Sequence, residues 1–111
     1  MDQALKQRIQ GLIDDNKVLI FMKGTPMFPQ CGFSAATIQI FSSLGYPFNT
    51  VNILDDAEIR QGIKEISNWP TIPQIYIDGE FIGGCDIVHE LYTRGELKPM
   101  VQQAVEGVPA Q

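Results

Sequence analysis

The sequence has little of what marks a membrane, secreted or nucleic-acid-binding protein. No apolar run approaches the roughly 20 residues that a helix needs to cross a bilayer. Residues 1–6 contain no basic stretch followed by an apolar one, so they do not resemble a secretory signal. The net charge is −5 and the eight Lys and Arg residues are scattered, which argues against nucleic acid as a partner. We expect a cytoplasmic protein with no membrane and no nucleic-acid partner, unless a targeting presequence was removed.

Cysteine is also scarce, since Cys31 and Cys85 are the only two and cannot build a disulfide framework. In a reducing compartment such cysteines are reactive, ligating or buried. No repeat or low-complexity segment interrupts the chain, and 44% apolar with 19% charged residues is a globular balance. The 111 residues are enough for one core. We expect a single domain over residues 1–111, with a loose tail at 107–111.

The spacing of apolar residues predicts alternating helices and strands in the first half of the chain. An amphipathic helix is expected over residues 2–15, followed by a strand at 18–22 that is buried on both faces. Two prolines and a glycine predict a loop at 24–30. A helix over residues 33–44 then ends at a glycine, and 48–53 reads as the next strand.

Capping and turn residues organise the second half. Asp55, with Glu58 three residues later, resembles a capping box and predicts a helix that starts there. Two prolines within residues 69–73 end this helix. An Asp-Gly pair at 78–79 between two apolar runs predicts a hairpin. Asp86 is expected to cap another helix, and a last short helix follows.

This element order predicts an α/β fold with a mixed four-stranded sheet flanked by helices on both faces. The first two strands are joined through a helix, so they must be parallel with a right-handed crossover. The hairpin then adds antiparallel strands. The order is similar to that of thioredoxin-like domains.

Cys31 is the first candidate for chemistry because it lies at the predicted start of the second helix. Unsatisfied N–H groups and a partial positive charge at that place stabilise a thiolate, and Lys23 could add a full charge. The alternative, a small core residue, is disfavoured by the flanking Gly32 and the proline-rich loop. Ser34 takes the place of the second cysteine of a Cys-x-x-Cys pair, so no internal disulfide can form there. Either another thiol comes from elsewhere or electron shuttling is not the main task.

Three motifs resemble those of the CGFS-type monothiol glutaredoxins. The first lies within residues 23–34, with Lys-Gly-Thr-Pro at its start and Pro-Gln-Cys-Gly-Phe-Ser at its end. The second is Trp-Pro-Thr-Ile-Pro-Gln at 69–74, and the third is Gly-Gly-Cys-Asp at 83–86. One tetrapeptide would be a weak signal, but three motifs in order on the expected elements are a strong one. The resemblance covers nearly the whole chain.

The resemblance implies a glutathione site. Lys23 and Arg60 are expected to pair with the terminal carboxylate of the tripeptide, Arg60 through its planar fork. For Arg60 the alternative is a solvated charge on an exposed helix face. In thioredoxin-like folds the bond before a proline such as Pro73 is typically cis, which would leave the Ile72 backbone free to pair with an extended peptide.

Cys85 and Asp86 complete the implied site at the start of a further helix, where backbone N–H groups can hold the γ-glutamyl carboxylate. The Asp86 side chain is expected to bind the ligand's amine, to cap the helix, or both. Packing beside two glycines is the favoured role for the Cys85 thiol, with a resolving or glutathionylated thiol as the alternative. Trp69 is expected in the core or the site wall, and His89 on the surface rather than on a metal.

The resemblance further implies a [2Fe-2S] cluster with Cys31 as its ligand from the chain. Such clusters usually take four ligands, which two chains and two glutathione thiols would supply in a homodimer. The implied function is cluster transfer or storage and iron homeostasis, with a BolA-like protein and apo iron–sulfur proteins as partners. The alternative is a glutathione-dependent deglutathionylase that uses Cys31 as a thiol–disulfide oxidoreductase. Ser34 and the loop at 24–30 favour the carrier, whereas a thiol of low pKa fits both.

Overall fold

The computed structural model describes residues 1–107, and the helices and strands follow the predicted order. A short 3₁₀ turn, η1, is the one addition. The elements are α1 (Gln3–Asp15), β1 (Val18–Met22), α2 (Gly32–Leu44), β2 (Asn49–Asn52), η1 (Ile53–Asp55), α3 (Ala57–Ser67), β3 (Gln74–Ile77), β4 (Glu80–Gly83), α4 (Cys85–Thr93) and α5 (Leu97–Glu106). Of the tail expected at 107–111, Gly107 is the C-cap of α5 and the other four residues lie outside the described part.

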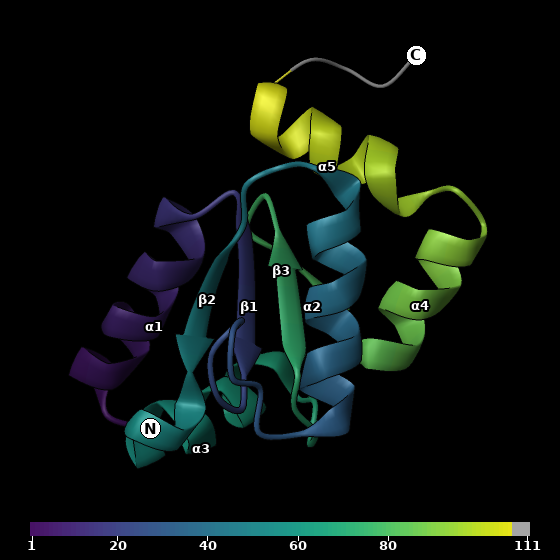
Figure 1. The fold of residues 1–111 in the computed structure, drawn as a ribbon. Helices are drawn as coiled ribbons and strands as arrows, with labels where there is room; N and C mark the ends of the chain where they lie inside the picture. Colours follow the sequence, from purple (N-terminus) through teal and green to yellow (C-terminus); the bar gives the residue numbers. More distant parts are fainter. Residues whose placement is uncertain (108–111) are drawn as a thin grey trace.

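The sheet has the strand order β2-β1-β3-β4, with β1 parallel to β2 and antiparallel to β3. β3 and β4 form the predicted hairpin, in which Asp78 and Gly79 both have positive φ angles. Helices α1 and α3 cover one face, and α2 and α4 cover the other, with α5 lying across the end of the sheet (Figure 1). The predicted fold class is confirmed.

Strand β1 is buried on both faces because it lies at the centre of two core layers. Its alternate residues Val18, Ile20 and Met22 pack with α2, α4 and α5, whereas Leu19 and Phe21 pack with α1 and α3. This alternation follows from the period of two in a strand. The packing fixes the C-terminal end of β1, from which the loop to α2 departs.

The helix start predicted at Asp55 is wrong by one residue. Asp55 belongs to η1, and the extended backbone of Asp56 makes that residue the N-cap of α3. Asp56 Oδ1 accepts hydrogen bonds of 3.1 Å from the N–H groups of both Glu58 and Ile59, and Oδ2 accepts one of 2.7 Å from Arg8. The Ile59 N–H and then Arg8 hold the pKa of Asp56 below its usual range.

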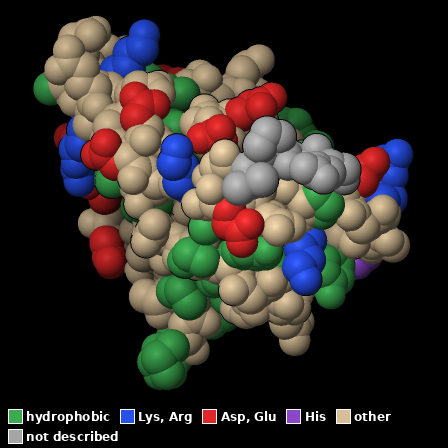
Figure 2. All heavy atoms as spheres, turned by 90° about the horizontal axis from the view of Figure 1, so that it is seen from above, with side chains coloured by type: hydrophobic (Ala, Val, Ile, Leu, Met, Phe, Trp, Pro, Cys, Tyr) green, Lys and Arg blue, Asp and Glu red, His purple; other side chains and the backbone are tan. Residues whose placement is uncertain are grey.

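No helix within residues 1–107 is long and apolar enough to cross a membrane. On the face seen in Figure 2, Lys and Arg side chains lie apart from one another between acidic and neutral groups. That face therefore carries no basic patch of the kind that follows a nucleic-acid backbone.

Candidate functional site

The loop between β1 and α2 folds back on itself as a compact hairpin. Thr25 and Phe28 exchange two backbone hydrogen bonds of 3.2 and 3.1 Å, and the Gln30 N–H donates to the Lys23 carbonyl at 2.9 Å. Gly24 has φ 91°, and a Cβ on it would overlap the carbonyl oxygen of Phe28. The closure therefore depends on glycine at this position.

Two side chains from other elements fasten this loop. Asn52, at the end of β2, accepts hydrogen bonds at Oδ1 from the N–H groups of Gly24 (2.9 Å) and Leu54 (3.0 Å). Ser34 is fully buried in α2, and its Oγ accepts the Lys23 N–H at 3.2 Å. The backbone of Lys23 is thus held at the start of α2. Sequence reasoning missed Asn52, whose only signal is an amide at the end of a strand.

Cys31 is the N-cap of α2, as predicted, and its side chain is partly exposed. The pKa of its thiol is lowered, first of all by the backbone N–H of Ser34. The Phe33 N–H, the Lys23 charge and the Ser34 hydroxyl also lower the pKa, whereas partial burial raises it. The start of the helix therefore favours the thiolate more than Lys23 does.

Two adjoining cavities bring four of the predicted site residues together. The first, of about 270 Å³, is lined by Phe33, Trp69, Thr71, Ile72, Pro73, Gly84, Cys85, Asp86 and Ile87. The second, of about 590 Å³, is lined by Cys31, Gly32, Phe33, Ala36, Cys85, Asp86 and His89. Neither Lys23 nor Arg60 lines either cavity. Cys31, Ile72, Cys85 and Asp86 therefore lie together around the two cavities, apart from Lys23 and Arg60.

The turn over residues 69–73 forms one wall of the first cavity. The Ile72–Pro73 peptide bond is cis, as the resemblance implied. Within residues 1–107, neither the N–H nor the C=O of Ile72 pairs with another protein group. Trp69 belongs to the same wall, and its Nε1 is buried with no partner in the described part of the chain. Its ring packs against Phe81 at a centroid distance of 5.8 Å.

The opposite wall is the start of α4, where the predicted Asp86 cap is wrong. The N-cap is Gly84. Asp86 is the second residue of the helix, and no side-chain capping hydrogen bond is present. The first backbone bond runs from the Val88 N–H to the Gly84 carbonyl at 3.1 Å. The N–H groups of the three preceding residues have no partner within the helix, and this is the usual state of a helix start. The residues that carry them, Cys85, Asp86 and Ile87, line the first cavity.

Gly84 explains how the two walls come so close. A Cβ on it would lie 3.3 Å from both the Pro73 carbonyl oxygen and Trp69 Nε1, a tight contact. Cys85 follows directly and is half-buried, as Cys31 is, so exposure does not distinguish the roles of the two thiols. His89 is exposed on α4, as expected. No group of three or more His, Cys, Asp or Glu within residues 1–107 could hold a metal ion.

Replacing Lys23 with alanine is expected to raise the pKa of the Cys31 thiol, because a nearby positive charge is lost. The pKa should stay below that of a free thiol, since the backbone N–H groups of Ser34 and Phe33 remain. The measurement is the alkylation rate against pH in a Cys85→Ser background, where Cys31 is the only thiol. The matched control is Lys17→Ala, which removes a lysine at the other end of β1. Identical titrations for both variants would mean that the Lys23 charge does not act on the Cys31 thiol.

The site and the fold define a class of protein. A four-stranded mixed sheet that places a cysteine of lowered pKa at a helix start, beside a cis-proline turn, is an arrangement for thiol chemistry or thiol ligation. The glutaredoxin family model matches residues 18–82. A monothiol glutaredoxin of Synechocystis is 58% identical over 105 residues, which cover 95% of this chain and 98% of that protein. The chain belongs to the glutaredoxin family, among its monothiol members.

Solved structures agree with this assignment. Reduced poplar apo GrxS14 is 55% identical with a TM-score of 0.78, over 90% of this chain and 92% of that one. A buckwheat glutaredoxin, solved as a complex with glutathione, is 27% identical with a TM-score of 0.82. That match covers 97% of this chain and 94% of the buckwheat chain.

Proposed function

We propose that the protein binds glutathione beside Cys31 and, together with it, holds a [2Fe-2S] cluster between two protomers. The role would be cluster transfer or storage, and through it iron homeostasis. The observation that carries the proposal is the state of the site cysteine. Cys31 is an accessible thiol of lowered pKa, and the serine three residues later is fully buried and bonded to the Lys23 N–H. The site therefore offers one thiol of lowered pKa and no second thiol at the position of Ser34.

The first cavity has the chemistry that a γ-glutamyl tripeptide requires. The unpaired N–H and C=O of Ile72 can take the extended peptide as an added strand. The N–H groups at the start of α4 can take a carboxylate, and Asp86 in its first turn can take the amine. Glutathione in this orientation would bring its sulfur toward Cys31 in the adjoining cavity. The glutathione complex of the buckwheat relative supports the same assignment.

The donor set also fits a shared cluster better than one held by a single chain. Cys31 would supply one thiolate, and no group of three or more His, Cys, Asp or Glu in the described residues could hold a metal ion by itself. Four thiolates would come from two copies of Cys31 and two glutathione sulfurs. When bound, the cluster would supply iron that these four sulfurs ligate. The task of the chain is to present Cys31 as a thiolate and to hold glutathione beside it.

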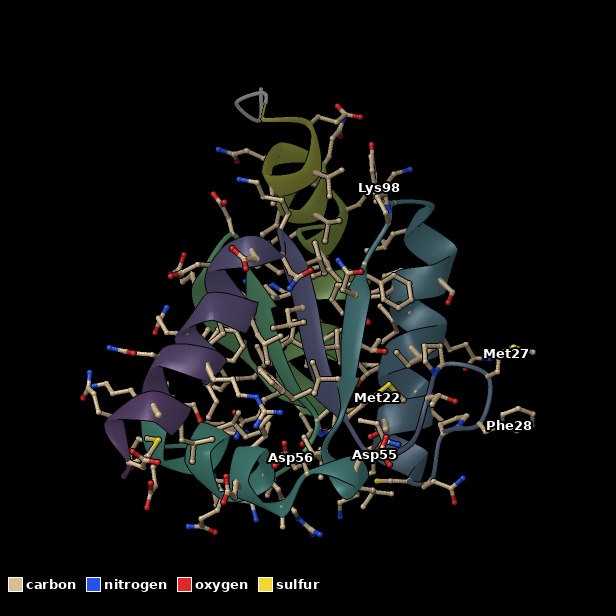
Figure 3. The ribbon with its side chains drawn as sticks, turned by 90° about the vertical axis from the view of Figure 1, so that its left-hand side faces the viewer. Met22, Met27, Phe28, Asp55, Asp56 and Lys98 are labelled. Atoms are coloured by element: carbon tan, nitrogen blue, oxygen red, sulfur yellow. The ribbon has the colours of Figure 1, made fainter. Side chains whose placement is uncertain are left out.

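The surface near Cys31 is suited to contact with another protein. Met27 and Phe28 at the tip of the loop are 83% and 69% exposed, and Phe33 beside Cys31 is 62% exposed. Figure 3 shows Met27 and Phe28 pointing away from the body of the domain. Exposed apolar side chains grouped at a site often mark an interface. A second protomer, a BolA-like protein or an apo iron–sulfur protein would have to approach this face.

A second candidate function is glutathione-dependent reduction of mixed disulfides, and the lowered pKa of Cys31 favours it equally. In that reaction Cys31 would attack a glutathionylated substrate, and free glutathione would resolve the product. The buried hydroxyl of Ser34 cannot act as a resolving thiol.

Turnover separates the two functions. We expect slow steady-state reduction of small mixed disulfides with glutathione and glutathione reductase, together with a brown colour in protein purified without oxygen. A dithiol glutaredoxin serves as the positive control in the same assay. Efficient turnover by colourless protein would favour the enzyme over the carrier.

A further inference from the structure

Gln74 is a polar side chain with an unusual position. It begins β3 and is fully buried, which is rare for glutamine. Its Nε2 donates hydrogen bonds to the carbonyls of Trp69 at 2.9 Å and Thr71 at 3.3 Å. Both acceptors belong to the turn that walls the first cavity. One carboxamide therefore holds that turn at two points from inside the fold.

The other end of the same carboxamide is not used. Gln74 Oε1 is buried, and no group in the described part of the chain donates to it. An unpaired buried carbonyl costs stability, so packing alone would favour an apolar side chain of similar size. The hydrogen bonds to the turn, and not the packing of the core, therefore explain a glutamine at this position.

We propose that Gln74 is a positioning residue for glutathione. Its two hydrogen bonds fix the turn on either side of Pro70 and directly before Ile72, and so orient the unpaired Ile72 N–H and C=O toward the ligand's backbone. Without the carboxamide, the two carbonyls can turn to water and the Ile72 peptide groups gain freedom. Binding must then order the turn as well as the ligand, and this lowers affinity. The inference rests on the proposed glutathione site.

The test compares two thiols that form the same bond with Cys31. In the Cys85→Ser background, Cys31 starts as a mixed disulfide with 2-mercaptoethanol. Glutathione then exchanges with it: its thiolate forms a new disulfide with Cys31 and 2-mercaptoethanol leaves as a thiol, with no net oxidation. The equilibrium ratio, read by mass spectrometry, reports the non-covalent contacts with the peptide. Gln74→Met should lower the preference for glutathione about 5- to 20-fold.

A second variant gives a signature that a merely structural role would not produce. In Gln74→Glu a protonated carboxyl can donate one O–H to a turn carbonyl, whereas a carboxylate can donate none. The preference of this variant for glutathione, divided at each pH by that of the Cys85→Ser protein with Gln74 intact, should therefore recover as pH falls. Gln74→Met should show no such recovery. Val101→Ala, which opens the core at α5 away from the turn, should keep the full preference.

An unchanged preference in Gln74→Met, or an equal loss in Val101→Ala, would overturn the positioning role. A Gln74→Glu variant whose relative preference does not change with pH would also overturn it, even if the methionine variant failed to fold. The variants could instead show the expected preferences for glutathione while the protein never binds a cluster. That result would overturn the proposed carrier function and leave the positioning role of Gln74 standing.

Discussion

Replacing Cys31 with serine is expected to abolish both cluster binding and the cluster-dependent dimer. Cys31 is the thiol at the start of α2, and backbone hydrogen bonds lower its pKa. A serine at this position would accept the same hydrogen bonds without becoming ionised. A neutral hydroxyl is a poor replacement for an iron-bound thiolate. After anaerobic reconstitution with glutathione, the variant should show no visible cluster absorption and should elute as a monomer.

Cys85→Ser is the matched control, because Cys85 lines both cavities and, in the proposed site, would contribute mainly its backbone at the start of α4. We expect weaker cluster retention in this variant and no complete loss. Equal and total loss in both variants would make Cys85 a direct ligand and would require a different arrangement of thiolates.

Arg60→Ala is expected to make the cluster labile and to make the dimer depend on excess glutathione. Arg60 lies on α3 and forms no ion pair in the described part of the chain, so its guanidinium is available for a carboxylate. Loss of one partly exposed charge-assisted contact should cost about 1–3 kcal/mol, roughly 5- to 150-fold in affinity. The measurement is cluster half-life against glutathione concentration.

Thermal stability should change little in Arg60→Ala, since no partner inside the fold is lost. Arg60→Lys should recover the affinity only in part, because lysine keeps the charge and lacks the fork. Arg94→Ala is the matched control, for Arg94 is an exposed arginine that pairs with Glu90 and Glu96 on the surface. A wild-type cluster lifetime in Arg60→Ala would mean that Arg60 is a solvated charge. Its position outside both cavity walls would agree with that result.

The sequence predicts most of the fold because its signals are local. The continuous apolar run of β1, the Asp-Gly pair of the hairpin and Gly45 after α2 each act through neighbouring residues, and the structure confirms all three. The N-cap of α3 is harder to predict, because two adjacent residues could each serve. Asp55 and Asp56 are adjacent, and the choice between them is made by the 3₁₀ turn before α3 and by Arg8 on α1.

The site is predicted less completely, since its geometry depends on contacts between distant segments. Cys31 could be placed from the local motif and its position before a helix. The roles of Asn52 and Gln74 could not, because each is defined by the backbone groups that the fold brings to it. Asp86 shows the same limit. Nothing in the local sequence says that Gly84, packed against Trp69 and Pro73, is the residue that begins the helix.

The proposed glutathione-bridged dimer can be checked by measuring the mass, iron content and glutathione content of the protein after anaerobic reconstitution with iron, sulfide and glutathione. Light scattering coupled to size exclusion gives the molar mass, and assays on the eluted peak give its iron and glutathione contents. We expect a brown dimer with two glutathiones and two irons per pair of chains, which returns to colourless monomers when the cluster is removed. A cluster-loaded monomer without a partner, or a dimer that keeps its cluster without glutathione, would contradict it.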